Sequence, residues 1–380
     1  MSHQIRRQEI GGVLIRDLAD QFGTPCYVYD SEPIRRRVAE LAAFDVIRYA
    51  QKANSNIAIV NWMRGLGVMV DAVSAGEIHR AFRAGYEAQG NPPPVVYTAD
   101  VFDDEALNLV VEHGVHVNCG SADMLAQLAE RQPGAHVTLR INPGFGHGHS
   151  QKTNTGGPQS KHGIWHEQLD DCLQSADRLG VAVTGLHMHI GSGTDLEHLA
   201  KVCQKMEETA LQVGRMITSI SAGGWLPTAY NENDSTIDIG RYFELWNATR
   251  GRLQDRFGHA VRLEIEPGRF LVAESGYLIG EIRATKWMGD NLFYLLDTGF
   301  NDLARPILYG SYHPMSVCSR QPSSRSVPVV VGGPLCESGD IFTQSEGGFV
   351  AARELPMARV GDLVVIECVG AYGHVMSSNY

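Results

Sequence analysis

Lys52 stands directly behind an apolar run, at the point where a buried strand would end. The run reads FDVIRYA over residues 44–50, and the small polar residues 53–56 after Lys52 are poor continuations of a strand. Such a lysine is either a surface residue in a loop or an amine that burial activates. An activated lysine amine forms a Schiff base with a carbonyl compound. Residues elsewhere in the chain decide between these interpretations.

Other polar residues also follow apolar runs that predict strands. His189 and Gly191-Ser192-Gly193 close one run, Gly223-Gly224 follows a second, and Glu266-Pro267-Gly268-Arg269 follows a third. In a barrel of parallel strands, the chemistry lies on the loops behind the carboxyl ends of the strands. The shared location of these residues is therefore better evidence for a site than any one of them.

Gly223, Gly224 and Ser192 have the chemistry of an anion site. Glycines let backbone N–H groups approach an anion closely, and the serine hydroxyl adds a donor, although a plain turn uses the same glycines. His187 and His189 alternate along a strand and so share one side of it. A metal site would need a third ligand. We therefore favour a flat imidazole that lies against an aromatic cofactor, and no metal site is predicted.

Glu266 ends a buried strand, where a carboxylate needs a partner. A protonated pyridine nitrogen would serve, as in enzymes that use pyridoxal 5′-phosphate (PLP), and a salt bridge to Arg269 is the alternative. Arg269 could also bind a phosphate or a carboxylate. A Schiff-base lysine, an anion site, a ring-facing histidine and a carboxylate for a ring nitrogen together describe a cradle for PLP. In this interpretation Lys52 carries the cofactor.

Three further segments carry polar groups in the last quarter of the chain. Arg305 and Tyr309 place a guanidinium and a phenol close together, and Cys336-Glu337 places a thiol beside a carboxylate. Tyr372 stands in the sequence GAYG. Each segment alone would be an ordinary turn, and a single cysteine is more often inert than reactive.

Short apolar runs alternate with amphipathic stretches through the first two thirds of the chain. Eight runs predict strands: 46–50, 68–73, 95–98, 115–118, 136–142, 183–190, 217–222 and 262–266. Apolar residues recur every three or four positions in 75–84, 104–112, 122–131, 196–213 and 242–256, which predicts helices. The alternation favours an α/β protein with a (β/α)8 barrel of TIM type, with an open doubly wound sheet as the competing arrangement.

The pattern of apolar and turn-forming residues changes after residue 270. The segments LIGEIRATKWMG, NLFYLLD, VPVVVGG, GGFVAARE and GDLVVIECVG are divided by turns rich in Gly, Pro and Ser. They predict a mostly antiparallel β domain, to which residues 12–30 add a strand. We therefore expect a barrel over residues 28–270 and a β domain formed by residues 1–27 and 271–380.

The bulk composition argues against several classes of protein. The chain has 43 acidic and 32 basic residues, and its net charge of −11 argues against a nucleic-acid-binding surface. No window approaches an uncharged membrane-spanning run, and the N-terminus lacks the apolar core of a secretory signal. The seven cysteines are scattered without a CxxC pair, which predicts free thiols. These features predict a cytoplasmic protein that binds neither nucleic acid nor membrane.

Ten segments resemble the diaminopimelate decarboxylase family of fold-type III PLP enzymes, to which ornithine and arginine decarboxylases are related. In chain order they are YAQKANSN, DAVSAGE, RINPGFGHGHSQKTNTGG, SKHGIW, GLHMHIGSG, SAGG, EIEPGRF, GFNDLARPILYGSYH, GPLCESGD and GAYGHVMSSNY. The resemblance covers nearly the whole chain and is closest to the bacterial lysine-forming branch. It implies an alanine-racemase-like architecture, a PLP-binding barrel followed by a β domain.

The resemblance also implies a role for each matching residue. Lys52 and Cys336 would be catalytic, as the Schiff-base lysine and the proton donor. The implied cofactor-binding residues are Lys52, His189, Ser192, Gly223, Gly224, Glu266, Gly268, Arg269 and Tyr372, with His189 on the ring and Glu266 on the pyridine nitrogen. The implied substrate-binding residues are Arg269, Arg305, Tyr309, Glu337 and Tyr372. Cys336 and Glu337 would enter the site from the second subunit of a head-to-tail homodimer.

The implied reaction is PLP-dependent decarboxylation of meso-2,6-diaminopimelate to L-lysine and CO2, the last step of lysine biosynthesis. Two departures support an alternative, a paralogous decarboxylase that acts on a related amino acid in toxin or antibiotic synthesis. Trp225 stands where the family has a third glycine, and the chain stops at Tyr380, which predicts that a final strand or helix is absent. A second alternative is a PLP-binding protein without turnover, but the retained substrate residues argue against it. The CESGD segment disfavours a racemase.

Overall fold

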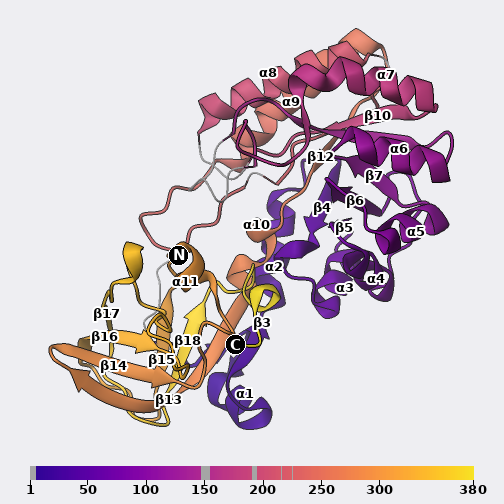
Figure 1. Ribbon diagram of the computed structural model, residues 1–380. Coiled ribbons are helices and arrows are strands. Elements are labelled where there is room, and N and C mark those ends of the chain that lie inside the picture. Colours follow the sequence, from indigo (N-terminus) through magenta and orange to yellow (C-terminus); the bar gives the residue numbers. More distant parts are fainter. Residues whose placement is uncertain (1–5, 147–154, 191–194, 215, 225) are drawn as a thin grey trace. The chain divides into compact units, whose positions relative to one another are not determined.

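The computed structural model describes residues 6–146, 155–190, 195–214, 216–224 and 226–380 (Figure 1). The chain divides into two compact units. We call Arg37–Pro227 with Thr236–Phe270 the barrel unit, and Met1–Arg36 with Thr228–Ser235 and Leu271–Tyr380 the β unit. The sequence-predicted residues Ser192 and Trp225 lie outside the described residues.

A closed ring of eight parallel strands forms the centre of the barrel unit. The strands are β4 (Val46–Ala50), β5 (Met69–Ala72), β6 (Val95–Ala99), β7 (His116–Cys119), β8 (His136–Asn142), β10 (Ala182–His187), β11 (Ser219–Ser221) and β12 (Arg262–Ile265). β12 pairs with β4, and β10 pairs with β8, which closes the ring. The short β9 (Ile164–Trp165) adds a parallel pairing to β8. The predicted barrel is confirmed, and closure rules out the open sheet.

Helices follow most of the strands, and several of them begin at side-chain caps. They are α2 (Ser31–Glu40), α3 (Ile57–Gly65), α4 (Ala75–Arg83), α5 (Asp104–His113), α6 (Ala122–Arg131), α7 (Leu169–Leu179), α8 (Leu196–Val213), α9 (Ile239–Phe257) and α10 (Arg269–Val272). Ser74, Asp103, Ser121, Asp195 and Asp238 each accept a hydrogen bond from a first-turn N–H, which fixes the start of five helices. Each of these five helices therefore begins at a residue whose side chain can cap its first turn.

One predicted strand end is wrong. The apolar run 183–190 continues through Ile190, but β10 ends at His187. The paired register with β11 ends at His187, and Met188 and Ile190 are buried beyond it. His189 therefore lies on the loop behind the strand and not within it.

The β unit contains the antiparallel sheet that the sequence predicts. Its strands are β13 (Gly276–Met288), β14 (Asn291–Leu296), β15 (Met315–Cys318), β16 (Ser326–Gly332), β17 (Arg353–Pro356) and β18 (Leu363–Glu367), with β3 (Cys26–Tyr29) paired to β13. Only the β14–β16 pair is parallel among the described strands of this sheet. The unit also contains β1 (Glu9–Ile10), β2 (Val13–Leu14), α1 (Ile15–Phe22) and the short helix α11 (Arg305–Tyr309). Its core packs Leu278, Tyr294, Val329 and Ile366 together.

Within the described part of the chain, no helix has both the length and the apolar character needed to cross a membrane.

Candidate active site

Lys52 lies on a single 3-10 turn, Gln51–Ala53, directly behind β4. The Asn54 N–H donates to the Gln51 carbonyl at 3.0 Å, and the Tyr49 hydroxyl donates to the Asn54 carbonyl at 2.8 Å. Gln51, Ala53 and Tyr49 are buried, whereas Lys52 itself is only half-buried. A rigid turn therefore presents the lysine at the carboxyl end of the barrel.

Four titratable groups on other elements are influenced by the charge of Lys52. They are Asp71 at the end of β5, Glu77 in the first turn of α4, His189 behind β10 and Glu266 behind β12. Coulomb interactions inside a protein weaken with distance and with solvent exposure. The charge of Lys52 therefore acts on groups from four different elements of the barrel.

Asp71 is the most unusual of these groups, because its side chain is fully buried. Neither carboxylate oxygen has a hydrogen-bond partner of normal geometry among the described residues, although Thr98 and Lys52 favour its charged form. Burial, followed by the charge of Glu266, raises the pKa of Asp71 well above its usual value. The one signal for this residue in the sequence is an acid within the apolar run VMVDAV.

Glu266 is held by a second buried residue that the sequence did not assign, His187. The His187 Nε2 and Glu266 Oε2 atoms are 3.1 Å apart, and the His187 ring is fully buried. Burial acts to raise the pKa of Glu266, but the charge and hydrogen bond of His187, together with Lys52, outweigh it and lower the pKa. His187 therefore keeps Glu266 in the anionic form.

We expect the His187→Leu substitution to raise the pKa of Glu266, because the donor is lost while the burial remains. A depressed carboxylate pKa preserves the anion down to low pH, so loss of His187 moves the acidic limb of the kcat/KM profile to higher pH. A charge-assisted hydrogen bond predicts a shift of about one pH unit. A pH titration of both enzymes measures the shift. The surface variant His79→Leu is the control, and an acidic limb unchanged by His187→Leu would contradict the role.

His189 is linked by its ring to the turn behind β11. The Gly224 N–H donates to His189 Nδ1 at 2.8 Å, which makes this nitrogen an acceptor. Burial, and then the charges of Arg140 and Lys52, lowers the pKa of His189 well below its usual value. The residue is therefore a neutral imidazole, fixed in one orientation beside the Gly223-Gly224 turn.

The turn at Gly223 and Gly224 accepts no side chain. Gly223 has a φ of +62°, and a Cβ atom on it would lie 2.6 Å from the Met188 carbonyl oxygen. A Cβ atom on Gly224 would lie 2.3 Å from the Glu266 carbonyl oxygen. The Glu266 N–H donates to the Gly223 carbonyl at 2.8 Å. The loops behind β10, β11 and β12 thus meet backbone to backbone, which leaves amide groups close to His189 and Glu266.

We expect Gly224→Ala to weaken cofactor affinity at least about tenfold. The new methyl group would clash with the Glu266 carbonyl oxygen, so the backbone of Glu266 would have to move. Equilibrium dialysis or a cofactor absorbance titration gives the dissociation constant. Gly251→Ala, in the interior of α9 with open space around the glycine, is a matched control that leaves the affinity unchanged. Equal affinities for both variants would show that the turn does not hold the cofactor.

The Glu266-Pro267-Gly268-Arg269 turn packs against the Lys52 turn. The Ala50 N–H donates to the Pro267 carbonyl at 3.2 Å. A Cβ atom on Gly268 would lie 3.0 Å from the Ala50 carbonyl oxygen and 3.1 Å from the Ala53 Cβ atom. Arg269 begins α10 and is half-buried. The structure thus brings six predicted residues together at one end of the barrel: Lys52, His189, Gly223, Gly224, Glu266 and Gly268.

This barrel set fits PLP in the chemistry of its groups. Lys52 supplies an amine, His189 a neutral flat ring and Glu266 an anionic carboxylate for a ring nitrogen. The absence of side chains at Gly223 and Gly224 lets the loops behind β10, β11 and β12 meet closely beside His189 and Glu266. Asp71 adds a buried acceptor without a hydrogen bond of normal geometry among the described residues.

Apart from Arg269, the other predicted residues that the structure describes belong to the β unit. Arg305 begins α11 and is buried, with its Nη1 atom 3.0 Å from His313 Nε2 and its guanidinium carbon 4.8 Å from the centre of the Tyr230 ring. Tyr309, at the end of the same helix, is 49% exposed. Tyr372 is half-buried and has a φ of +57°, a backbone conformation that is rare for a residue with a side chain.

Cys336 and Glu337 lie on an exposed loop that a buried carboxylate holds in place. Asp340 accepts hydrogen bonds from the N–H groups of Phe300 and Leu335, both at 2.8 Å. The Cys336 and Glu337 side chains are exposed, and Glu337 Oε2 accepts a hydrogen bond from the Tyr380 hydroxyl at 3.2 Å. The predicted residues therefore divide into a barrel set and a β-unit set.

Comparison with known proteins extends these observations to nearly the whole chain. Residues 32–273 match the family model of the pyridoxal-dependent decarboxylases, pyridoxal binding domain. The chain is 53% identical to diaminopimelate decarboxylase of Streptomyces coelicolor over 374 residues, which are 98% of this chain and 85% of the relative. It is 52% identical to that of Escherichia coli K12 over 367 residues, 96% of this chain and 87% of the relative.

Solved structures agree with the sequence comparison. A crystal structure of diaminopimelate decarboxylase, 49% identical, superposes with a TM-score of 0.93 and covers 100% of this chain and 91% of its own. A Helicobacter pylori diaminopimelate decarboxylase complexed with L-lysine, 30% identical, has a TM-score of 0.83 over 96% of this chain and 91% of its own. The chain belongs to the pyridoxal-dependent decarboxylases and, among them, to the diaminopimelate decarboxylase family.

Proposed function

We propose that this protein decarboxylates meso-2,6-diaminopimelate to L-lysine and CO2, the last step of lysine biosynthesis. The observation that carries the proposal is identity of about one half, over nearly the full chain, to proteins named diaminopimelate decarboxylase. The paralogue and the silent PLP-binding protein are not favoured. A Helicobacter pylori relative is described in complex with L-lysine, the product of the proposed reaction.

The barrel set prepares the cofactor side of the reaction. When bound, PLP supplies an electron sink for the pair released as the Cα–carboxylate bond breaks. Lys52 would hold the cofactor through its amine, and Glu266, kept anionic by His187, would hold a proton at the ring nitrogen. His189 would contact the ring as a neutral imidazole. Gly223, Gly224 and Gly268 would let the backbone approach, and Ser192 would add a hydroxyl for the phosphate.

The β-unit set binds the substrate and completes the reaction. Arg305 and Tyr309, with Arg269 of the barrel unit, bind substrate carboxylates, and Tyr372 contacts cofactor and substrate. Glu337 binds the distal ammonium group. When CO2 leaves, the Cys336 thiol delivers a proton to Cα, so that hydrogen replaces the lost carboxylate. A site built for two charged ends rejects analogues that lack one of them.

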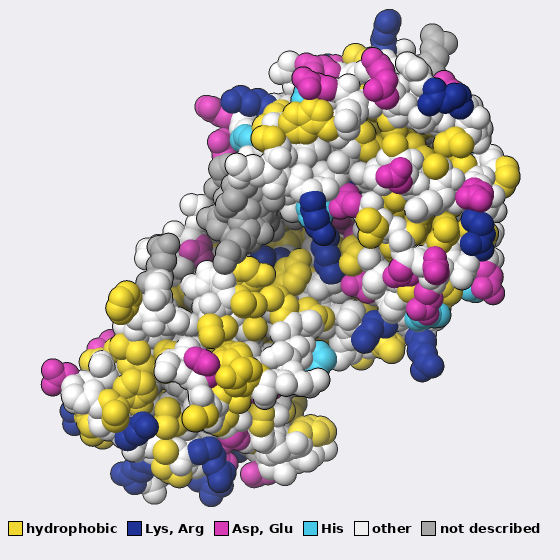
Figure 2. Space-filling model, in the orientation of Figure 1, with side chains coloured by type: hydrophobic (Ala, Val, Ile, Leu, Met, Phe, Trp, Pro, Cys, Tyr) yellow, Lys and Arg dark blue, Asp and Glu magenta, His cyan; other side chains and the backbone are white. Residues whose placement is uncertain are grey.

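We propose further that the active unit is a homodimer in which Cys336 and Glu337 serve the partner's barrel. Both side chains are exposed, which suits residues that act on another subunit. Figure 2 shows hydrophobic side chains gathered on the visible face of the β unit. The β unit also has large exposed apolar residues, among them Trp287, Phe349 and Val360. Patches of this kind mark protein interfaces.

The test is release of CO2 and L-lysine from meso-diaminopimelate by PLP-loaded protein. LL-diaminopimelate, L-ornithine and L-lysine, offered under the same conditions, report selectivity for the distal amino acid end. Turnover of the meso compound alone supports the proposal. Cofactor binding without turnover of the meso compound, with turnover of one of the others, would assign a different substrate.

A further inference from the structure

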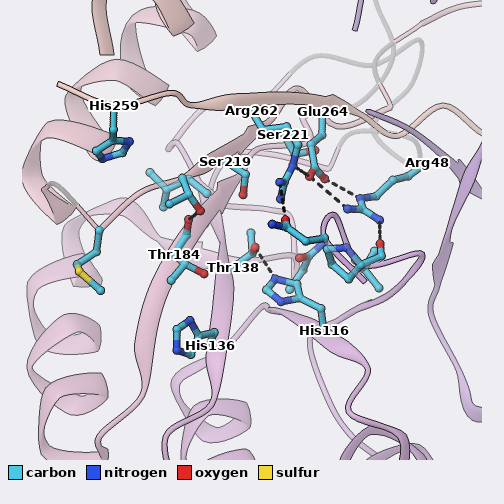
Figure 3. A pocket seen from close by; sticks show the side chains of 17 residues that line it. Arg48, His116, His136, Thr138, Thr184, Ser219, Ser221, His259, Arg262 and Glu264 are labelled. Atoms are coloured by element: carbon cyan, nitrogen blue, oxygen red, sulfur yellow. Dashed lines mark hydrogen bonds and ion pairs between the residues drawn. The ribbon is translucent and has the colours of Figure 1, made fainter. Parts of the chain in front are cut away.

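A second cavity lies inside the barrel, at the opposite ends of its strands from Lys52 (Figure 3). We call it the basal cavity; its volume is about 450 Å³. His116, His136, Ser219 and Arg262 line it, and they are the first residues of β7, β8, β11 and β12. Lys52, in contrast, follows the last residue of β4. The basal cavity is therefore distinct from the candidate active site.

The choice of residues keeps the basal cavity open. Barrel interiors are usually filled by branched aliphatic side chains. Here Thr138, Thr184, Ser219 and Ser221 line the space with short hydroxyl side chains. A Cβ atom on Gly185 would lie 2.4 Å from the Thr138 hydroxyl and 2.8 Å from the Ser219 hydroxyl. Unfilled barrel volume costs stability, so a cavity of this size with hydroxyl, imidazole and guanidinium groups on its wall indicates a use.

The charged groups of the basal cavity have an excess of positive charge. Arg48 donates to the two Glu264 oxygens at 2.6 and 3.2 Å, and Arg262 donates to one of them at 2.8 Å. Two guanidiniums thus share the single carboxylate of the described lining. Figure 3 shows these three side chains on one side of the space and His116 below them. The excess positive charge contrasts with the net charge of −11 of the whole chain.

The pKa of His116 responds to the charged groups of the basal cavity. The Nε2 atom of His116 lies 2.9 Å from the Thr138 hydroxyl. Burial, followed by the charges of Arg48, Arg262 and His136, lowers the pKa of His116 to about 4, and Glu264 opposes these effects. A bound anion would act in the opposite direction and favour the protonated ring.

We propose that the basal cavity is a binding site for a small oxyanion, a carboxylate or phosphate compound. Arg262 and Arg48 provide the attraction, and the hydroxyl groups of Thr138, Ser219 and Ser221 provide short donors of the kind that fix an anion's orientation. The site is independent of the proposed decarboxylation, because none of its lining residues belongs to the barrel set or the β-unit set.

The experiment is a calorimetric titration of PLP-loaded protein with inorganic phosphate and, separately, with citrate, at constant ionic strength. Loading with PLP occupies the cofactor's own phosphate site. Arg262→Gln is expected to weaken binding at least about tenfold, because it removes a charge-assisted donor from the lining. Ser219→Leu, which fills the cavity, is expected to weaken both probes similarly. Arg256→Gln, an exposed arginine of α9, is the matched charge control and leaves binding unchanged.

Tighter binding of phosphate would identify a phosphate compound as the ligand class, and tighter binding of citrate a carboxylate. Saturation with either probe should also raise the pKa of His116, which an NMR titration of the imidazole measures. No heat from either probe would overturn the proposal and leave a water-filled cavity. Binding that survives both Arg262→Gln and Ser219→Leu would also overturn it, because the anion would then sit elsewhere, for example on the substrate-binding arginines.

Discussion

Lys52→Ala is expected to reduce decarboxylation of meso-diaminopimelate by about 10³-fold or more, since it removes both the covalent hold on the cofactor and a group that moves protons. The barrel should remain folded. The hydrogen bonds that form the turn, from Asn54 to Gln51 and from Tyr49 to Asn54, use no atom of the lysine side chain. The expected defect is therefore chemical and not structural.

CO2 release under single-turnover conditions measures the Lys52→Ala defect, and far-UV circular dichroism with thermal unfolding checks the fold. Lys201→Ala, an exposed lysine on α8, is the matched control and should keep wild-type activity. Turnover retained by Lys52→Ala would remove Lys52 from the reaction. Loss of both activity and cooperative unfolding would instead assign the residue to the structure of the barrel.

Cys336→Ala is expected to slow L-lysine formation by about 10²-fold, the usual loss when a positioned proton donor is removed. Cofactor affinity should not change, because Cys336 lies on the loop that Asp340 holds and not in the barrel set. Stopped-flow measurement of product formation, with Cys368→Ala as the control thiol, tests this role. An unchanged rate would exclude Cys336 as the donor.

Mixing the two inactive variants tests the shared site. If Cys336 of one subunit serves Lys52 of the other, random exchange gives mixed dimers with one intact site each, and activity returns to about a quarter of the wild-type value. If both residues act within one subunit, the mixture remains inactive. Dimer exchange is followed independently by native mass spectrometry, so a mixture that fails to exchange is recognised.

The strands of the barrel could be predicted because buried parallel strands read as uninterrupted apolar runs. Several helices could not, α3 and α7 among them. In α3 the sequence IAIVNWM is apolar on nearly all sides, and in α7 the buried face is made partly of Cys172 and Ala176, whose small side chains give a weak pattern. The prediction also extends β10 too far, because Ile190 is buried although it lies beyond the end of the strand.

Site residues could be predicted where the residue type by itself indicates the chemistry, as for Lys52, Glu266 and the pair Gly223-Gly224. They could not be predicted where the chemistry arises from a neighbour. His187 matters through its 3.1 Å contact with a carboxylate 79 positions away in the chain. Asp71 is unusual because it interacts with the charge of Lys52 and has no hydrogen bond of normal geometry within the described residues. Neither property can be seen in the linear sequence.

The pairing of β3 with β13 has a consequence for synthesis on the ribosome. Tyr29 lies opposite Gly276, so the strand made first acquires its partner only after 247 further residues. At elongation rates of 5–20 residues per second this delay is roughly 10–50 s. All eight barrel strands, which lie between residues 46 and 265, are synthesised during this interval. Residues 26–29 therefore gain their partner strand only after the whole barrel has been synthesised.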